Sequence, residues 1–387
     1  MKDESQFLLL PGPTPVPTNI LRAMSTPMIN HRGAEFKELL EYCTEGVKRI
    51  YRTKNDLVIF PSAGSGAMEA AVVNFISPGD KVLAISIGVF GDRFAKIAGT
   101  FGAQVTKLDF PFGEAADPAK VKEAIDADTK KEYKAVLVTH NETSTGVLND
   151  IKAIRQAVGD HPALIIVDAV SGLGAADLRT DEWNLDVVVS GSQKAFMLPP
   201  GLSFMSASPR AIKVAETCTN TKFYWDLGEA LKYLKKGQTP YTPAISMFYG
   251  LREALEMMLD EGLDNVLARH AFYRDIVRTG VKAMGLEFLA KDEVASYSLT
   301  SVKAQGGSGA NKIRKSLLER FNVVIAGGQQ SLDDVIFRIG HLGYVRPLDL
   351  LSVLAALEIV LYENGYNIKL GQGIKKAQEL FVKKEEA

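Results

Sequence analysis

Short runs of apolar residues alternate with longer amphipathic stretches through the first half of the chain. Apolar runs of about four to eight residues are typical of buried strands, whereas longer stretches with helical periodicity predict helices. The pattern predicts strands over 57–60, 81–86, 104–109, 135–139, 163–168, 186–189 and 202–207. Helices are predicted between most of them, over 34–50, 64–76, 90–101, 117–126 and 151–158. This alternation indicates an α/β fold with a mostly parallel seven-stranded sheet and helices on both faces.

The pattern changes after residue 243, where two long helical stretches, 244–260 and 263–284, follow each other. Beyond them, shorter segments suggest strands over 286–290, 296–303, 321–326 and 335–339, and helices over 310–320 and 348–363. This mixture predicts a smaller C-terminal α+β domain. The first residues are rich in proline, which favours extended backbone. We therefore expect an N-terminal arm over 1–18, a large domain over 19–257 and a small domain over 258–387.

Composition narrows the class of protein. The chain has 387 residues, of which 46% are hydrophobic and 24% charged, as in globular proteins with a substantial core. A net charge of −1 gives no indication of binding to nucleic acid or a membrane surface. The apolar runs are too short to span a bilayer, and no signal peptide is recognisable. The two cysteines and five histidines show no metal-ligand spacing, so we expect no metal site and a cytoplasmic location.

One lysine follows a predicted strand with three consecutive valines. Val187, Val188 and Val189 lead into the small polar turn Ser190–Ser192, and Lys194 comes two residues after it. An amine at the end of a buried strand is poorly solvated, which lowers its pKa and makes it a nucleophile able to form a Schiff base. The plainer interpretation is a surface lysine that happens to follow a strand.

An acid ends the predicted strand before it. Asp168 closes the run that starts at Ala163, and only small or aliphatic residues follow, from Ala169 to Gly174. Open α/β sheets bind ligands outside the carboxyl ends of their strands, where both Asp168 and Lys194 are expected. The two could form a simple ion pair. They also match the groups that pyridoxal phosphate requires, an acid for its ring nitrogen and an amine for its aldehyde.

A glycine-rich turn joins the predicted strand 57–60 to the helix that follows. It reads Pro61-Ser-Ala-Gly-Ser-Gly-Ala67. Free backbone N–H groups and the positive end of a helix dipole make such a turn suitable for a phosphate. The Gly-Lys-Ser/Thr of a nucleotide P-loop is missing, and Glu69 breaks the dinucleotide spacing. A tight strand-to-helix turn without any ligand is the alternative.

Together these features resemble the class V aminotransferases of the fold-type I pyridoxal-phosphate superfamily. The likeness is closest to the alanine–glyoxylate and serine–glyoxylate aminotransferase group and covers nearly the whole chain. The motifs that carry it are Leu10–Pro17, Ser62–Gly66, Thr139–Val147, Val167–Val170, Ser190–Lys194, Thr239–Pro243 and Phe337–Gly340. The resemblance implies pyridoxal 5′-phosphate as cofactor and a homodimer as the assembly.

The resemblance also implies roles for individual residues. Lys194 and Asp168 are the expected catalytic residues, and both also bind the cofactor. Further cofactor contacts are expected from Ser65, Gly66, Ala67, Phe90, Thr143, Val170 and Gln193. The first three would hold the phosphate. Phe90 would cover the ring where close relatives carry a tryptophan, and core packing is the alternative.

The resemblance implies two further kinds of contact, one across the dimer and one with the substrate. Tyr241 and Thr242 are expected to reach the cofactor of the partner subunit, unless they form only a polar turn. Gly12 and Arg338 are expected to bind the substrate. Arg338 interrupts an apolar run, which is costly without a partner, and a guanidinium can bind a carboxylate with two hydrogen bonds. A structural ion pair is the alternative for Arg338.

The expected reaction is transfer of an amino group from alanine or serine to a 2-oxo acid, glyoxylate or pyruvate. Small donors are favoured because no second arginine stands in a recognised motif for a distal carboxylate. Ureidoglycine or an aminophosphonate could be the substrate instead. A cysteine desulfurase is disfavoured because 285–387 contains no cysteine. A non-catalytic oligomer subunit that keeps the fold is the alternative from another class.

Overall fold

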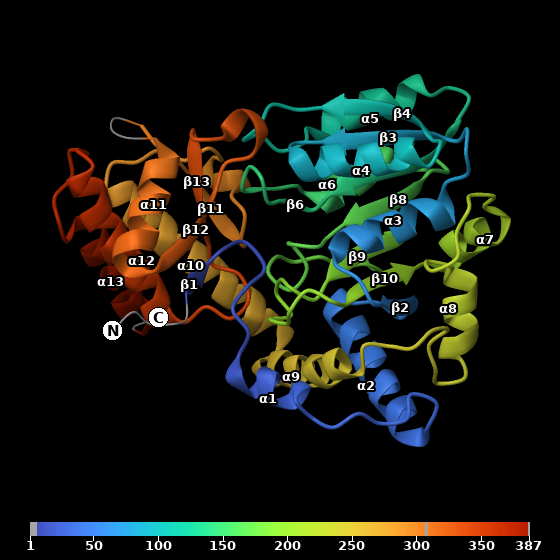
Figure 1. The fold of residues 1–387 in the computed structure, drawn as a ribbon. Coiled ribbons are helices and arrows are strands. Elements are labelled where there is room, and N and C mark those ends of the chain that lie inside the picture. The colour runs from blue at the N-terminus through green and yellow to red at the C-terminus, as the bar shows by residue number, and fades with distance from the viewer. Residues whose placement is uncertain (1–5, 306–308, 386–387) are drawn as a thin grey trace.

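The computed structural model describes residues 6–305 and 309–385, and the predictions for 1–5, 306–308 and 386–387 lie outside the described residues. A large domain built around one long sheet stands beside a smaller domain that contains the last helices (Figure 1). The fold is the α/β class that the sequence pattern predicts.

The large domain contains a seven-stranded sheet in the order β2-β10-β9-β8-β5-β3-β4. Its strands are β2 (Asp56–Phe60), β3 (Lys81–Ser86), β4 (Gln104–Asp109), β5 (Tyr133–Thr139), β8 (Leu164–Asp168), β9 (Val187–Gly191) and β10 (Ser203–Ala207). Strand β10 runs antiparallel to β2 and β9, and the other neighbouring pairs are parallel. All seven predicted strands are present: β3 and β4 have the predicted bounds, and the others differ by one or two residues at one or both ends.

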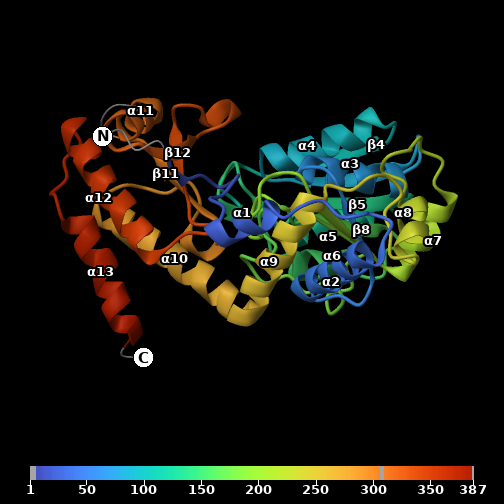
Figure 2. The same ribbon diagram turned by 60° about the horizontal axis from the view of Figure 1, so that its bottom comes forward.

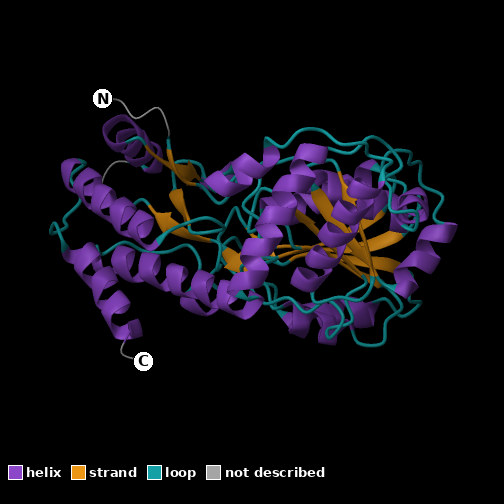
Figure 3. Cartoon of the chain, turned by 90° about the horizontal axis from the view of Figure 1, so that it is seen from below, coloured by secondary structure: helices purple, strands orange, loops and turns teal. Residues whose placement is uncertain are grey.

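Inner strands of this sheet such as β8 and β9 are buried on both faces, which explains their apolar runs, whereas the edge strand β4 is partly exposed. In β3, Leu83 and Ile85 pack into one core, and Val82 and Ala84 pack into the other. The first core includes α1 (Thr18–Met24), α2 (Ala34–Tyr51), α5 (Pro118–Ala127), α6 (Ile151–Val158) and α9 (Ile245–Glu261). The second includes α3 (Gly64–Phe75), α4 (Val89–Thr100), α7 (Pro209–Thr217) and α8 (Leu227–Leu234). Helices therefore cover both faces of the sheet (Figure 3).

A long helix links the two domains. Gly262, at φ 85°, separates α9 from α10 (Leu263–Ala283). Val266 of α10 packs into the large-domain core, whereas Tyr273 and Ile276 pack into the core of the small domain. The predicted boundary after residue 257 falls within α9, and the division into arm and domains stays a prediction.

The small domain has a four-stranded sheet in the order β1-β12-β13-β11. Its strands are β1 (Phe7–Leu9), β11 (Leu299–Lys303), β12 (Val323–Gly327) and β13 (Ile336–Gly340), and its helices are α11 (Ala310–Phe321), α12 (Pro347–Glu363) and α13 (Gln372–Glu385). Helix α13 packs along α10 and α12 (Figure 2). Strand β1 comes from the N-terminal arm and pairs in parallel with β12, so the arm joins this sheet.

The predicted strand over 286–290 is wrong. This segment makes a single antiparallel bridge between Phe288 and Val302. Gly285, at φ 80°, ends the preceding helical region, and the chain enters a short 3₁₀ helix, η1 (Asp292–Val294), soon afterwards. Two backbone hydrogen bonds join it to β11, from Leu289 N to Ser301 O and from Lys303 N to Glu287 O, and the pairing is confined to this bridge. The other short elements are β6 (Asn141–Glu142), β7 (Val147–Leu148) and η2 (Gln330–Leu332).

Candidate active site

A cavity lies at the carboxyl edge of the large sheet, where the parallel strands end. The residues that line it are Gly64, Ser65, Met68, Phe90, Arg93, Asn141, Thr143, Asp168, Val170, Ser171, Gln193 and Lys194. They come from the starts of α3 and α4 and from the segments that follow β5, β8 and β9. Seven predicted site residues therefore meet in one place: Ser65, Phe90, Thr143, Asp168, Val170, Gln193 and Lys194.

Lys194 is a buried amine, with 8% of the residue exposed. Its Nζ donates a hydrogen bond to the carbonyl oxygen of Pro11, at 2.7 Å. Burial lowers the pKa of Lys194 to about 8, against the opposing effect of the Asp168 carboxylate. A useful fraction of the amine is consequently unprotonated near neutral pH, as a nucleophile requires.

Gly12 leaves the space in which this lysine lies. Its φ is 128°, and a Cβ at this position would stand 2.6 Å from Lys194 Cδ. A side chain at position 12 would therefore push the lysine out of place. Gly12 thus contacts the proposed catalytic lysine, and its predicted contact with substrate stays a prediction.

Asp168 is buried at the end of β8, 3% exposed. Burial raises the pKa of its carboxyl to about 7, although the hydrogen bond from Val170 N to Oδ1, at 2.9 Å, opposes the shift. That bond is the only one its carboxylate accepts among the described residues, whereas a carboxylate can accept about four. The site therefore has room for a positively charged donor, and the protonated ring nitrogen of pyridoxal phosphate fits this need.

The start of α3 supplies open backbone donors. Its N-cap, Ala63, makes no side-chain capping bond, and the first N–H groups of a helix have no partner within the helix. A Cβ on Gly64 would stand 2.6 Å from Val170 Cγ2, so glycine lets the helix begin this close to the turn after β8. Gly64 and Ser65 line the cavity. The other two predicted phosphate residues, Gly66 and Ala67, are absent from its lining.

Helix α4 places two side chains at the cavity. Phe90 was expected there from the sequence, and Arg93 was not. The Arg93 guanidinium lies 4.7 Å from the centre of the Phe90 ring. Its Nη1 donates to Ser65 Oγ at 3.3 Å. The three-residue spacing on the predicted helix 90–101 was the available signal, because residues at i and i+3 share a helix face.

Arg338 lies behind the wall of the cavity on β13. It is 6% exposed, and burial lowers its pKa to about 10. Its Nη1 donates to the carbonyl of Thr143 at 2.7 Å, and its Nε donates to the carbonyl of Gly327 at 2.8 Å. It forms no ion pair within the part of the chain that the structure describes, so carbonyl groups hold it instead.

Tyr241 and Thr242 lie elsewhere, in a separate hollow beside the end of β2. Tyr241 stacks on Tyr224 with ring centres 4.9 Å apart, and its hydroxyl donates to the carbonyl of Phe223 at 3.1 Å. Phe223 is 76% exposed. The structure of one chain therefore does not bring these two predicted residues to the Lys194 cavity.

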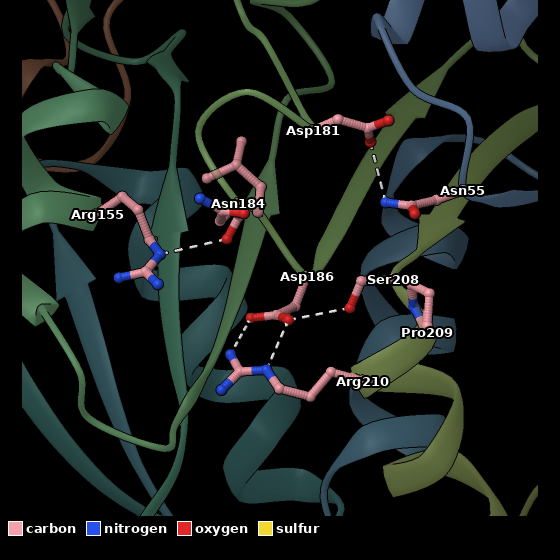
Figure 4. A pocket seen from close by; sticks show the side chains of 9 residues that line it. Asn55, Arg155, Asp181, Asn184, Asp186, Ser208, Pro209 and Arg210 are labelled. Carbon is pink, nitrogen blue, oxygen red and sulfur yellow. Dashed lines mark hydrogen bonds and ion pairs between the residues drawn. The ribbon is translucent and has the colours of Figure 1, made fainter.

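A larger hollow occupies the opposite edge of the sheet (Figure 4). Its charged groups already have hydrogen-bond partners within the protein. Asp186 pairs with Arg210 and accepts from Ser208 Oγ at 3.0 Å. Arg155 Nε donates to the carbonyl of Asn184 at 3.2 Å. We therefore place the functional site at the Lys194 cavity, where the charged groups have unused capacity.

The described residues contain neither a metal-binding cluster nor a membrane-spanning helix. No cluster of three or more His, Cys, Asp or Glu side chains is arranged to bind a metal ion. No helix within the described ranges combines the length and apolar character needed to cross a membrane.

Comparison with known proteins points to one family. The family model described as "Aminotransferase class-V" matches residues 7–347. The serine–glyoxylate aminotransferase of Methylorubrum extorquens is 38% identical over 96% of this chain and 94% of its own length. The L-aspartate–glyoxylate aminotransferase of Paracoccus denitrificans is 40% identical over 96% and 95%. A protein of a Synechococcus species named as the small subunit of a soluble hydrogenase is 44% identical over 98% and 99%.

Solved structures agree with this grouping. The crystal structure of the ureidoglycine–glyoxylate aminotransferase from Bacillus subtilis superposes with a TM-score of 0.92. It is 31% identical in sequence and covers 99% of both chains. The fold is therefore shared over the whole described chain, including the small domain.

Proposed function

The chain belongs to the class V aminotransferases, and we propose that it transfers the amino group of alanine or serine to glyoxylate or pyruvate. The observation that carries this proposal is the pairing of a buried lysine and a buried carboxylate, Lys194 and Asp168, in one cavity. We propose pyridoxal 5′-phosphate as the cofactor. When bound, it supplies an aldehyde that takes up the amino group and a ring that accepts electrons.

Lys194 has two tasks in this proposal. Its amine would hold the aldehyde while no substrate is bound and, once the substrate amine has displaced it, would remove the proton from the substrate α-carbon as a general base. A pKa of about 8 lets it accept and return a proton near neutral pH. The carbonyl of Pro11, 2.7 Å from Nζ, gives the amine a polar contact in an otherwise buried position.

The remaining cavity residues would position the cofactor. Asp168 would keep the ring nitrogen protonated, and Phe90 would cover a face of the ring. The hydroxyl of Thr143, which donates to Ser171 Oγ at 2.7 Å, lines the cavity and would contact a substituent of the ring. The N–H groups at the start of α3 would bind the phosphate. Val170 and Gln193 would complete the walls.

We further propose a homodimer in which Tyr241 or Thr242 reaches the cofactor of the partner subunit. The stacked aromatic side chains of Tyr224 and Tyr241 and the 76% exposed Phe223 form a patch of the kind that marks protein interfaces. Light scattering should give twice the mass of the chain. A monomer that is fully active in dilute solution would contradict this assembly.

Arg338 is the proposed binding group for the substrate α-carboxylate. We predict that Arg338→Lys lowers kcat/KM for every amino acid and 2-oxo acid tested. The expected loss corresponds to about 2–4 kcal/mol of activation free energy. Lysine keeps the charge but loses the planar fork that holds the carboxylate and the Thr143 and Gly327 carbonyls. Steady-state kinetics with several donors would show the loss. A loss confined to one substrate would contradict the assignment.

The donor and the cellular location are proposed on separate grounds. Serine is the donor named for one relative, aspartate for another and ureidoglycine for a third. We propose a small donor for this chain. A cytoplasmic location is proposed because both cysteines are free.

A screen of single amino acids tests the proposal. The protein loaded with pyridoxal phosphate is mixed with one amino acid at a time, without an oxo acid, and the 2-oxo acid released is identified by mass spectrometry. We expect one equivalent of product from alanine or serine. Release from aspartate or glutamate alone would overturn the small-donor part of the proposal.

A further inference from the structure

Arg93 is the second positively charged side chain that lines the cavity, besides Lys194. It lines the cavity together with Lys194 and Asp168. In the described ranges, Arg93 forms no ion pair with an acidic side chain, and the adjacent Asp92 pairs instead with Lys107 at 2.7 Å. Its hydrogen bond to Ser65 Oγ and its contact with the Phe90 ring are both to neutral groups.

The cavity is lined by more positive than negative side chains. Two of the described lining residues are cations, Lys194 and Arg93, and one, Asp168, is an acid. In the proposed function, Lys194 would bond to the aldehyde of the cofactor and Asp168 would pair with its ring nitrogen. A phosphate monoester carries a charge of roughly −1.5 to −2 at neutral pH. The start of a helix offers only about half a positive charge, so the start of α3 alone leaves most of the phosphate charge uncompensated.

We propose that Arg93 binds the phosphate group of the cofactor from the α4 side, together with the first N–H groups of α3. This inference rests on the proposed function, because it presupposes a phosphorylated cofactor in this cavity. Nη1 of Arg93 is already 3.3 Å from Ser65 Oγ, at the first turn of α3. A guanidinium presents several donors in a plane, which suits phosphate oxygens.

The position of Arg93 on its helix supports this role. Phe90 and Arg93 lie three residues apart on α4 and therefore share one face. One turn of this helix can thus cover the ring with Phe90 and bind the phosphate with Arg93. The Phe90 ring, 4.7 Å from the guanidinium carbon, also restrains the arginine through a cation–π contact.

The test compares two ligands that differ only in the phosphate. Cofactor-free wild-type protein, Arg93→Gln and Arg93→Lys are titrated with pyridoxal 5′-phosphate and with pyridoxal, and binding is followed by quenching of protein fluorescence. Arg155→Gln serves as the control, because it removes a positive charge at the opposite edge of the sheet (Figure 4). A thermal melt of each variant shows that the fold is retained.

We expect Arg93→Gln to weaken binding of pyridoxal 5′-phosphate about 10- to 100-fold, the range for a hydrogen bond to a charged group. Binding of pyridoxal should stay within about twofold of wild type, Arg93→Lys should recover part of the loss, and Arg155→Gln should change neither constant. Equal losses for both ligands would show a merely structural role and overturn the proposal. Unchanged binding of both ligands, with a raised KM for aspartate alone, would assign Arg93 to a distal substrate carboxylate instead.

The same titrations separate this inference from the proposed function. A wild-type protein that binds neither ligand would overturn the proposed function itself. A wild-type protein that prefers the phosphorylated ligand, with Arg93→Gln equally selective, would overturn only the role of Arg93.

Discussion

Replacing Lys194 by alanine should reduce transamination by roughly 100- to 10,000-fold, the range for loss of a positioned general base. The amine is the basic side chain in the cavity with a pKa near the operating pH, about 8. Its removal also takes away the group proposed to hold the cofactor aldehyde. The remaining cavity residues would still bind the phosphate and the ring, so the variant should retain the cofactor less tightly but detectably. Initial rates with alanine and glyoxylate provide the measurement.

The identity of this lysine can be checked chemically. Borohydride treatment of the wild-type protein loaded with pyridoxal phosphate should attach the cofactor irreversibly to Lys194, and peptide mapping locates the modified residue. Lys222 is a matched control, because it also donates to a backbone carbonyl, that of Cys218, but lies outside the cavity. The assignment fails when the modification is found on a lysine other than Lys194.

Replacing Asp168 by asparagine should lower turnover about 100- to 1,000-fold, as does loss of a preorganised electrostatic group in other active sites. Asparagine keeps the size of the side chain and can still accept the hydrogen bond from Val170 N. It cannot supply the negative charge that keeps the ring nitrogen protonated. Affinity for the cofactor should change far less than turnover, because the phosphate contacts remain. Unchanged turnover would remove Asp168 from the catalytic site.

The same variant should alter how stability depends on pH in the cofactor-free protein. The folded-state pKa of Asp168 is raised from 3.8 to about 7, so the folded state binds more protons than the unfolded state between these values. Stability of the wild type therefore falls as pH rises through this window, and Asp168→Asn should lose that part of the fall. Lys194 acts in the opposite direction at higher pH, between about 8 and 10.5, so thermal melts can distinguish the two groups.

The fold was largely predictable because the inner strands of the large sheet are buried on both faces. They appear as apolar runs such as Val187–Val189, and the predicted helices between the strands are also found. The direction of β10 was not predictable, since an antiparallel strand buried on both faces has the same apolar pattern as a parallel one. The segment 286–290 has a composition that suits a strand, but its pairing with β11 is confined to the bridge between Phe288 and Val302, which no local pattern indicates.

The site was predictable to the extent that sheet topology determines it. Asp168 ends β8, and Lys194 comes three residues after the end of the neighbouring parallel strand β9, so the sheet itself brings them to one edge. The contact of Pro11 and Gly12 with Lys194 joins residues more than 180 positions apart and has no local signature in the sequence. Arg93 was missed because an arginine on an amphipathic helix usually points into solvent. Only the folded structure shows that it lies beside Phe90 and Ser65 at the cavity.

In the proposed reaction, the chain transfers an amino group from a small amino acid to a 2-oxo acid, using Lys194. The most direct measurement mixes the purified protein and pyridoxal phosphate with glyoxylate and with alanine or serine whose nitrogen carries a heavy isotope. Mass spectrometry then follows the label into glycine. We predict labelled glycine with the wild-type protein and a loss of at least about 100-fold in its rate with Lys194→Ala. Glycine formed equally fast by both proteins, or no labelled glycine with either donor, would contradict the account.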